Sequence, residues 1–112
     1  MAEVEINLGP LERIPRGEGR AFDVPGGQIA VFRTRDDEIH ATEAFCPHRQ
    51  GPLADGFVGG GRVVCPLHAF HFDLGTGAAV GHGCRSLVTY AVRVDETGDV
   101  LLTDRSSESA AA

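Results

Sequence analysis

The sequence predicts an all-β fold in one domain, on three observations. The chain of 112 residues contains 15 glycines and 6 prolines, which leaves few stretches long enough for a helix. Several segments alternate between apolar and polar residues and end in turn-forming sequences, as β-strands do. Hydrophobic residues make up 42% of the chain, close to the globular average, and the length suffices for one core.

The N-terminal half predicts one clear hairpin. Residues 3–8 alternate weakly and suit a first strand, whereas residues 10–22 are rich in turn formers and hold only a short charged segment of helical character. Residues 28–35 form a strand with both faces partly covered, because Ile29 and Val31 share one face and Ala30 and Phe32 the other. Residues 35–38 are the turn, and residues 39–45 return as the partner strand that ends at Cys46.

The C-terminal half predicts four further strand segments. Val63 and Val64 form a short strand before Cys65, and residues 70–77 form a strand with a buried aromatic face that ends in a Gly-Thr-Gly turn. Residues 87–96 have the clearest strand pattern, and residues 97–99 turn the chain back into a strand at residues 100–104. The domain therefore spans residues 1–104, and residues 105–112, which are small and polar, are expected to be a disordered tail.

Charge and hydropathy narrow the classes of partner. The net charge of −6 argues against nucleic acid, which requires a basic face. No apolar run is long enough for a membrane helix, and the first residues do not resemble a secretory signal, so we expect a cytoplasmic protein without a membrane partner. Three cysteines in such a protein favour metal binding over a disulfide framework.

Two Cys/His units flank a glycine-rich loop, each directly after a predicted strand. Cys46 and His48 are two residues apart, and side chains at that spacing in an extended stretch point the same way. Cys65 and His68 are three residues apart, and a tight turn with Pro66 at its second position brings such side chains together. The pattern C-x-H-x16-C-x2-H therefore lets both units present a thiolate and an imidazole to one metal site.

Two metal groups accept two cysteines and two histidines. Zinc binds this donor set in a tetrahedron, but the usual zinc finger places both histidines on a helix after a pair of cysteines. Here the order is Cys, His, Cys, His, and a strand pattern follows His68. A zinc site in an assembly module is therefore the weaker hypothesis, and a [2Fe–2S] cluster is the stronger one.

The residues around the four ligands resemble the Rieske family. The segment CPHRQGPLADG (46–56) is similar to the family's first loop, VVCPLHAFHFDLGTG (63–77) to its second loop and the next strand, and TYAVRVD (89–95) to its closing strands. The resemblance implies an antiparallel β-sandwich with a cluster-binding subdomain of two loops, at about residues 45–70. It also implies that Cys46 and Cys65 bind one iron of the cluster and that His48 and His68 bind the other.

The resemblance predicts a reduction potential at the low end of the Rieske range. High-potential members carry a disulfide between the two loops, and Ser and Tyr hydroxyls that bond to sulfur. Those positions are Gly51, Leu67, Phe70 and Phe72 in this sequence. Fewer hydrogen bonds to sulfur stabilise the reduced state less, so we expect a midpoint near −150 mV, the lower end of a range of about −150 to +300 mV.

The sequence predicts an electron-carrying subunit and not a self-sufficient enzyme. The glycines of GGGR (59–62) precede a strand and do not open a helix, so they are not a dinucleotide-binding fingerprint. The chain then needs a reductase or a large catalytic subunit with flavin or NAD(P)H, and a terminal oxidoreductase. Its loops resemble those of the small subunit of NAD(P)H-dependent nitrite reductases. The alternative is a ferredoxin that serves an aromatic-ring-hydroxylating dioxygenase.

The remaining cysteine and histidines receive no metal role, because the set of four ligands is complete; they are Cys84, His40, His71 and His82. Phe70 and Phe72 are expected in the core. Asp73 is placed to cap the turn at Gly75–Gly77.

Overall fold

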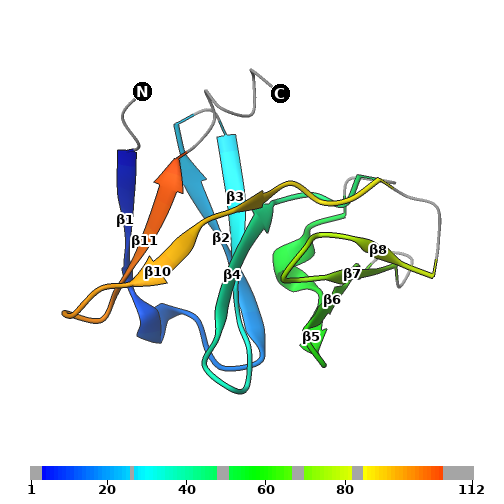
Figure 1. Ribbon diagram of the computed structural model, residues 1–112, viewed down its shortest axis with the longest axis horizontal. Coiled ribbons are helices and arrows are strands. Elements are labelled where there is room, and N and C mark those ends of the chain that lie inside the picture. Colours follow the sequence, from blue (N-terminus) through cyan, green and yellow to red (C-terminus); the bar gives the residue numbers. More distant parts are fainter. Residues whose placement is uncertain (1–3, 26, 48–50, 67–69, 82–84, 105–112) are drawn as a thin grey trace.

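The computed structural model describes residues 4–25, 27–47, 51–66, 70–81 and 85–104, and it confirms the all-β fold (Figure 1). The described strands form three antiparallel sheets, in the orders β1-β11-β10, β2-β3-β4-β9 and β5-β6-β7-β8. The strands and two short 3-10 turns are β1 (Val4–Pro10), η1 (Leu11–Arg13), β2 (Glu18–Val24), β3 (Gly27–Arg33), β4 (Ile39–Glu43), η2 (Leu53–Asp55), β5 (Phe57–Gly59), β6 (Arg62–Val64), β7 (His71–Asp73), β8 (Ala79–Val80), β9 (Thr89–Tyr90), β10 (Val92–Val94) and β11 (Asp99–Asp104). Neither 3-10 turn is long or apolar enough to cross a membrane, and the described ranges hold no other helix.

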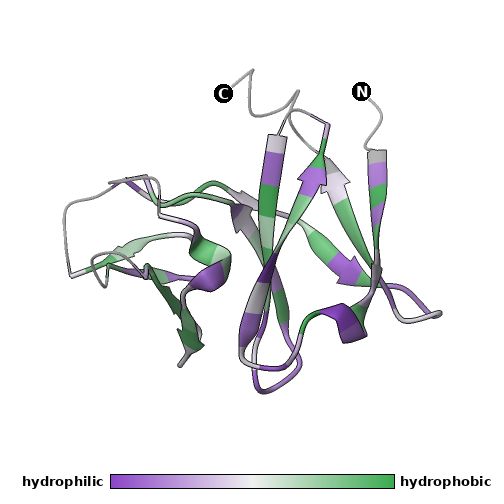
Figure 2. Ribbon diagram, turned by 180° about the vertical axis from the view of Figure 1, so that it is seen from behind, coloured by the Kyte–Doolittle hydropathy of each residue, from purple (hydrophilic) through white to green (hydrophobic). Residues whose placement is uncertain are grey.

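The first two sheets form a sandwich around one core. Figure 1 shows β1, β11 and β10 on one side of β2, β3 and β4. The strands show alternating apolar and polar bands in Figure 2, as expected when one face of each is buried. The buried members of this core are Leu8, Ile14, Ile29, Val31, Ala41, Val100 and Leu102.

The third sheet packs beside this sandwich, and β3 of the sandwich contributes side chains to the cores on both of its faces. Ile29 and Val31 belong to the sandwich core, whereas Ala30 and Phe32 point to the opposite face and belong to a second core. The inward residues of the third sheet, Val58, Val63 and Phe72, pack in that second core. The prediction that both faces of this strand are covered is therefore confirmed, because all four side chains are buried. β3 thus anchors the smaller sheet to the sandwich.

The strand β2 was missed by the sequence analysis, which assigned residues 10–22 to turns. Its seven residues pair with β3 in a regular register from Glu18↔Arg33 to Val24↔Gly27. The buried position in its first half is Gly19, where a Cβ would lie 2.5 Å from Cδ1 of Phe32. The ring of Phe32 fills the space that an apolar side chain on β2 would occupy, so the strand lacks the usual alternating pattern.

The prediction of a single strand at residues 87–96 is wrong, because the structure divides this segment between two sheets. β9 pairs with β4, and β10 pairs with β11. Ala91 lies between them, and its carbonyl accepts a hydrogen bond of 2.9 Å from the Thr103 amide. The chain crosses from one layer of the sandwich to the other at this point. A crossing of this kind leaves the alternating pattern intact, which is why the sequence did not reveal it.

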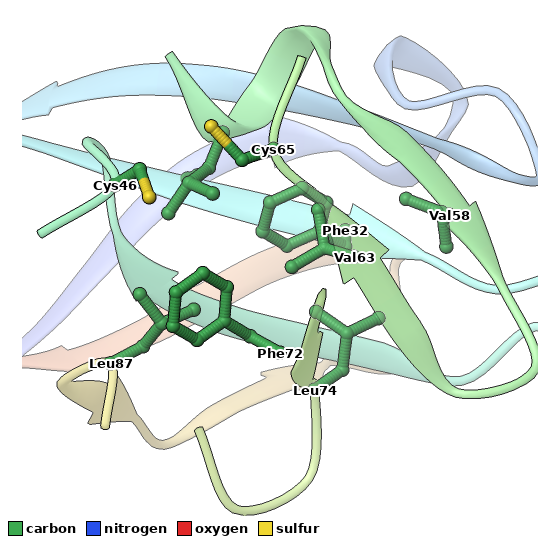
Figure 3. Packing of buried hydrophobic residues seen from close by; sticks show 10 residues of the cluster. Phe32, Cys46, Val58, Val63, Cys65, Phe72, Leu74 and Leu87 are labelled. Carbon is green, nitrogen blue, oxygen red and sulfur yellow. The ribbon is translucent and has the colours of Figure 1, made fainter. Parts of the chain in front are cut away.

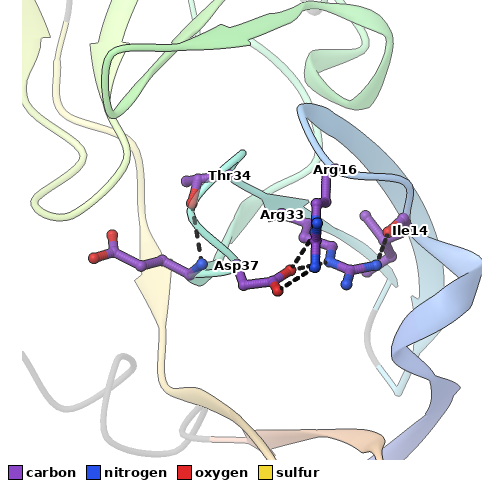
Figure 4. Close-up of polar contacts among 6 residues, drawn as sticks. Ile14, Arg16, Arg33, Thr34 and Asp37 are labelled. Atoms are coloured by element: carbon purple, nitrogen blue, oxygen red, sulfur yellow. Dashed lines mark hydrogen bonds and ion pairs between the residues drawn. The ribbon is translucent and has the colours of Figure 1, made fainter.

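The predicted turn between β3 and β4 is held by an acidic residue in a left-handed conformation. Asp37 has φ +67°, and its carboxylate accepts hydrogen bonds from Arg16 at 2.7 and 3.0 Å and from Arg33 at 2.8 Å (Figure 4). The hydrogen bonds from both guanidinium groups, together with their charges, lower the pKa of Asp37. Arg33 also donates to the Ile14 carbonyl at 3.0 Å, so the turn is tied to the segment before β2.

Asp37→Ala is expected to lower the melting temperature by about 3–8 °C, because alanine is strained at positive φ and makes no ion pair. Asp37→Gly relieves the strain and loses only the ion pairs, so its melting temperature should stay closer to that of the wild type. The folded-state pKa of Asp37 is lowered, so its ion-pair stabilisation is present at neutral pH and is lost as the pH falls below the ordinary aspartate value. The difference between wild type and Asp37→Gly should therefore shrink in acid, as thermal melts at several pH values would show.

Candidate metal centre

Each of the two Cys/His units begins a loop that is closed by the same backbone hydrogen bond. The Cys46 amide donates to the Gly51 carbonyl at 2.8 Å, and the Cys65 amide donates to the Phe70 carbonyl, also at 2.8 Å. In both cases the acceptor lies five residues after the cysteine. The similarity of the two units in sequence is therefore matched by a similarity of their backbone closure.

The strands on either side hold each cysteine in place. After β4, Phe45 bridges to Pro52, and the Leu53 amide donates to the Ala44 carbonyl at 3.0 Å. The second loop joins β6 to β7, and the two strands pair with Val64 opposite His71. Both cysteines therefore sit at the point where a paired backbone opens into a loop, which confirms that strands deliver them.

Cys46 and Cys65 are buried in the second core, with 0% and 1% of their surface exposed. Figure 3 shows both side chains at the same end of this core, which continues behind them through Phe32, Val63, Phe72 and Leu74. The two cysteines do not form a disulfide with each other. Two thiols at one end of an apolar core suit a metal group, since iron compensates the charge of buried thiolates.

The other two predicted ligands, His48 and His68, lie outside the described residues, as do Cys84 and His82. The structure therefore places two of the four predicted ligands, and within the described ranges no group of three or more ligating side chains occurs. His71 lies half-buried on β7 beside Val64 and Val80 in the neighbouring strands. His40 lies half-buried on β4, in the sandwich and away from the two loops.

Apolar side chains line the core behind the cysteines. Leu53, Phe72, Leu74 and Leu87 are each at most 3% exposed, and Phe70 packs half-buried against them. The predictions that Phe70 and Phe72 belong to the core are confirmed. The turn after β7 is capped as predicted, because Asp73 Oδ1 accepts the Gly75 amide at 2.8 Å and the Thr76 amide at 3.0 Å. The apolar side chains behind the cysteines exclude water from the side of the site that faces the core.

A third segment, residues 85–88, closes the same end of the core and was not singled out from the sequence. The Leu87 amide donates to the Gly77 carbonyl at 2.7 Å, and the Leu87 side chain packs in the core that holds both cysteines. Glu43, the last residue of β4, accepts two hydrogen bonds from Arg85, at 2.7 and 2.8 Å. Burial raises the pKa of Glu43, but the hydrogen bonds from Arg85 and the Val88 amide and the charge of Arg85 outweigh it, so the pKa is lowered.

These features define a class: a small β-sandwich in which two buried cysteines begin two loops at one end of a core. Comparison with known proteins identifies the family, because residues 5–91 match the sequence model of the Rieske [2Fe–2S] domain. The ferredoxin component of a naphthalene 1,2-dioxygenase system from Pseudomonas aeruginosa is 33% identical over 96 residues, which cover 85% of this chain and 91% of that protein. The chain therefore belongs to the Rieske [2Fe–2S] family, and it is an electron-transfer protein with a [2Fe–2S] cluster.

Solved structures agree with this assignment. The ferredoxin of carbazole 1,9a-dioxygenase from Nocardioides aromaticivorans has a TM-score of 0.82 and 28% identity, over 91% of this chain and 99% of that chain. A carbazole 1,9a-dioxygenase ferredoxin seen in complex with its oxygenase has a TM-score of 0.79 and 26% identity, over 91% and 94%. A protein assigned as the NADH-dependent nitrite reductase small subunit of Mycobacterium tuberculosis has a TM-score of 0.85 over 93% and 97%, and at 24% identity this likeness concerns the fold.

Phe72→Tyr is expected to raise the midpoint potential by about 40 mV or more. A tyrosine hydroxyl in the core that holds both cysteines can donate to a cysteine sulfur and stabilise the reduced cluster, and about 1 kcal/mol of differential hydrogen bonding corresponds to this shift. Redox titration of the purified variant measures it. Phe22→Tyr, half-buried against the sandwich core, is the control and should leave the potential unchanged. An unchanged midpoint in Phe72→Tyr would contradict the expectation.

Proposed function

We propose that this chain is a low-potential Rieske carrier that accepts one electron at a time from a reductase and passes it to a terminal oxygenase, as a ferredoxin component does. The supporting observation is 33% identity to the ferredoxin component of a naphthalene 1,2-dioxygenase system over nearly the full length of both proteins. The complex of a related ferredoxin with its oxygenase supports a partner of that class. We place the carrier in the cytoplasm, where a reductase has NAD(P)H available.

In this proposal Cys46, His48, Cys65 and His68 are the four ligands of the cluster. The two cysteines lie on the buried side and the two histidines complete the set from the same loops. When bound, the cluster supplies a one-electron couple whose potential is set by its ligands and by the hydrogen bonds to its sulfurs. The apolar core behind the cysteines keeps water from that side, and the short loops hold the ligand positions through the Cys46 and Cys65 amides.

The face that the partners would use lies beside the first loop. Phe45 is 41% exposed directly before Cys46, and Pro52, to which it bridges, is exposed as well. An exposed apolar rim next to a redox centre favours brief contact with another protein at short electron-transfer distance.

The small subunit of an NAD(P)H-dependent nitrite reductase, the partner assignment that the loop sequences favoured, is the second candidate. The TM-score of 0.85 to a protein of that assignment supports it at the level of fold. The two candidates share the cluster and the carrier role, and they differ in the terminal enzyme. A third hypothesis, a zinc-binding assembly module, shares the four ligands but carries no electrons.

Metal analysis and EPR of the purified protein test the proposal. The carrier should contain about two iron atoms per chain and, after dithionite reduction, give a rhombic signal with a low average g. A colourless protein with one zinc and no signal would overturn the proposal and favour the assembly module. Reconstitution then separates the two candidates: electrons from NADH should reach a ring-hydroxylating oxygenase in one case and nitrite bound to a nitrite reductase large subunit in the other.

A further inference from the structure

A charge pair, Glu43 with Arg85, ties the third segment to the end of β4 beside the proposed cluster site. We propose that Glu43 and Arg85 hold residues 85–88 against the two cysteine loops and that the balance of their charges adjusts the midpoint. The proposal rests on the cluster of the proposed function. Both residues are positioning residues, because they act on the cluster through the backbone and through space.

Glu43 binds the third segment through four hydrogen bonds. Its carboxylate accepts hydrogen bonds from both terminal nitrogens of Arg85, at 2.7 and 2.8 Å, and from the Val88 amide, at 2.7 Å. Its own amide donates to the Val88 carbonyl at 2.9 Å. A carboxylate with a bidentate arginine and a backbone donor has a fixed geometry, unlike most surface ion pairs. The Glu43 side chain is only 20% exposed, so solvent screens the pair incompletely.

Each member of the pair lies close in sequence to a residue of the core that holds the proposed cluster site. Glu43 is three residues before Cys46, which limits the distance between their Cα atoms to about 11 Å. Arg85 is two residues before Leu87, whose side chain packs in the core that holds Cys46 and Cys65 (Figure 3). Glu43 and Arg85 are 42 positions apart, and the intervening chain includes both loops, so the pair joins the chain before the first loop to the chain after the second.

The two charges of the pair act on an added electron with opposite signs. Arg85 stabilises the reduced cluster and Glu43 destabilises it, and the two effects largely cancel while the pair is intact. Loss of the Glu43 charge alone therefore raises the midpoint potential, and loss of the Arg85 charge alone lowers it. Simple loosening of residues 85–88 would instead admit water in both variants and move both midpoints in the same direction. The sign of the two shifts separates an electrostatic role from a structural one.

The experiment is redox titration of purified, cluster-loaded Glu43→Gln, Arg85→Gln and the double variant. We expect an upward shift for Glu43→Gln, a downward shift for Arg85→Gln, and a double variant closer to the wild type than either. Arg85→Lys keeps the charge and should restore most of the Arg85→Gln shift. Glu5→Gln is the matched control, because Glu5 forms a similar bidentate pair with Arg93, at 2.9 Å for both bonds, on β1 and β10 of the sandwich.

Shifts of equal sign, or no shift in either single variant with full iron content, would overturn the inference and leave the carrier role intact. Absence of iron from the wild-type protein would instead overturn the proposed function itself. If Glu43→Gln fails to fold, Arg85→Gln and Arg85→Lys still decide the question, because Arg85 is 57% exposed and its replacement leaves Glu43 bound to the Val88 amide. A lower midpoint in Arg85→Gln that Arg85→Lys restores supports the inference.

Discussion

Cys46→Ser is expected to abolish cluster binding, with iron falling from about two atoms per chain to almost none. Cys46 is fully buried, so no exposed side chain can enter the core and replace it as a ligand. A serine hydroxyl is far less acidic than a thiol, and a buried alkoxide is costly. Iron and sulfide assays with visible absorption measure the loss, and far-UV circular dichroism shows whether the sheets remain.

Cys84→Ser is the control for this variant, because Cys84 lies outside the predicted set of four ligands. We expect its iron content, spectrum and midpoint to match the wild type. Cluster loss in Cys84→Ser together with retention in Cys46→Ser would contradict the ligand assignment. Cluster retention in both variants would show that the site does not depend on Cys46.

Gly77→Ala is expected to destabilise the fold by about 3 kcal/mol or more and to loosen the third segment from the cluster site. Gly77 has φ +81°, and a Cβ there would lie 2.3 Å from the Leu87 carbonyl oxygen and 3.1 Å from Cγ2 of Thr89. The Gly77 amide donates to Asp73 and its carbonyl accepts from Leu87, both at 2.7 Å, so the backbone cannot move aside without breaking these bonds.

Gly81→Ala is a matched control for the backbone conformation. Gly81 has φ +80°, but a Cβ there meets no atom of the described residues within 4 Å. Its loss of stability should be about 1 kcal/mol, from the left-handed conformation alone. Urea denaturation followed by circular dichroism measures both variants, and cluster absorbance reports on the site. Equal losses in the two variants would contradict the role given to the contact between Gly77 and Leu87.

The predictions from sequence were strongest where a pattern is local. The two faces of β3 could be predicted because Ile29 and Val31 alternate with Ala30 and Phe32 within one strand, and each pair enters a different core. The capping of the turn by Asp73 was predictable for the same reason, since its hydrogen-bond partners lie two and three residues away. The ligand motif is also local within each unit, although only Cys46 and Cys65 fall in the described residues.

Features that depend on distant contacts were missed. β2 lacks an alternating pattern because its buried position is Gly19, and the side chain that fills the space comes from Phe32 on the next strand. The break at Ala91 is decided by which sheet each half of the segment pairs with, β4 or β11.

The β class, the hairpin before Cys46, the spacing of the four predicted ligands and the family could all be read from the sequence, because they depend on residues a few positions apart. Tertiary structure alone decided the burial of both cysteines in one core and the contact of Gly77 with Leu87. It also decided the pairing of Glu43 with Arg85 across 42 residues. Such contacts form only when separate sheets pack together, and the free energy of that packing depends on the whole chain and not on any short pattern within it.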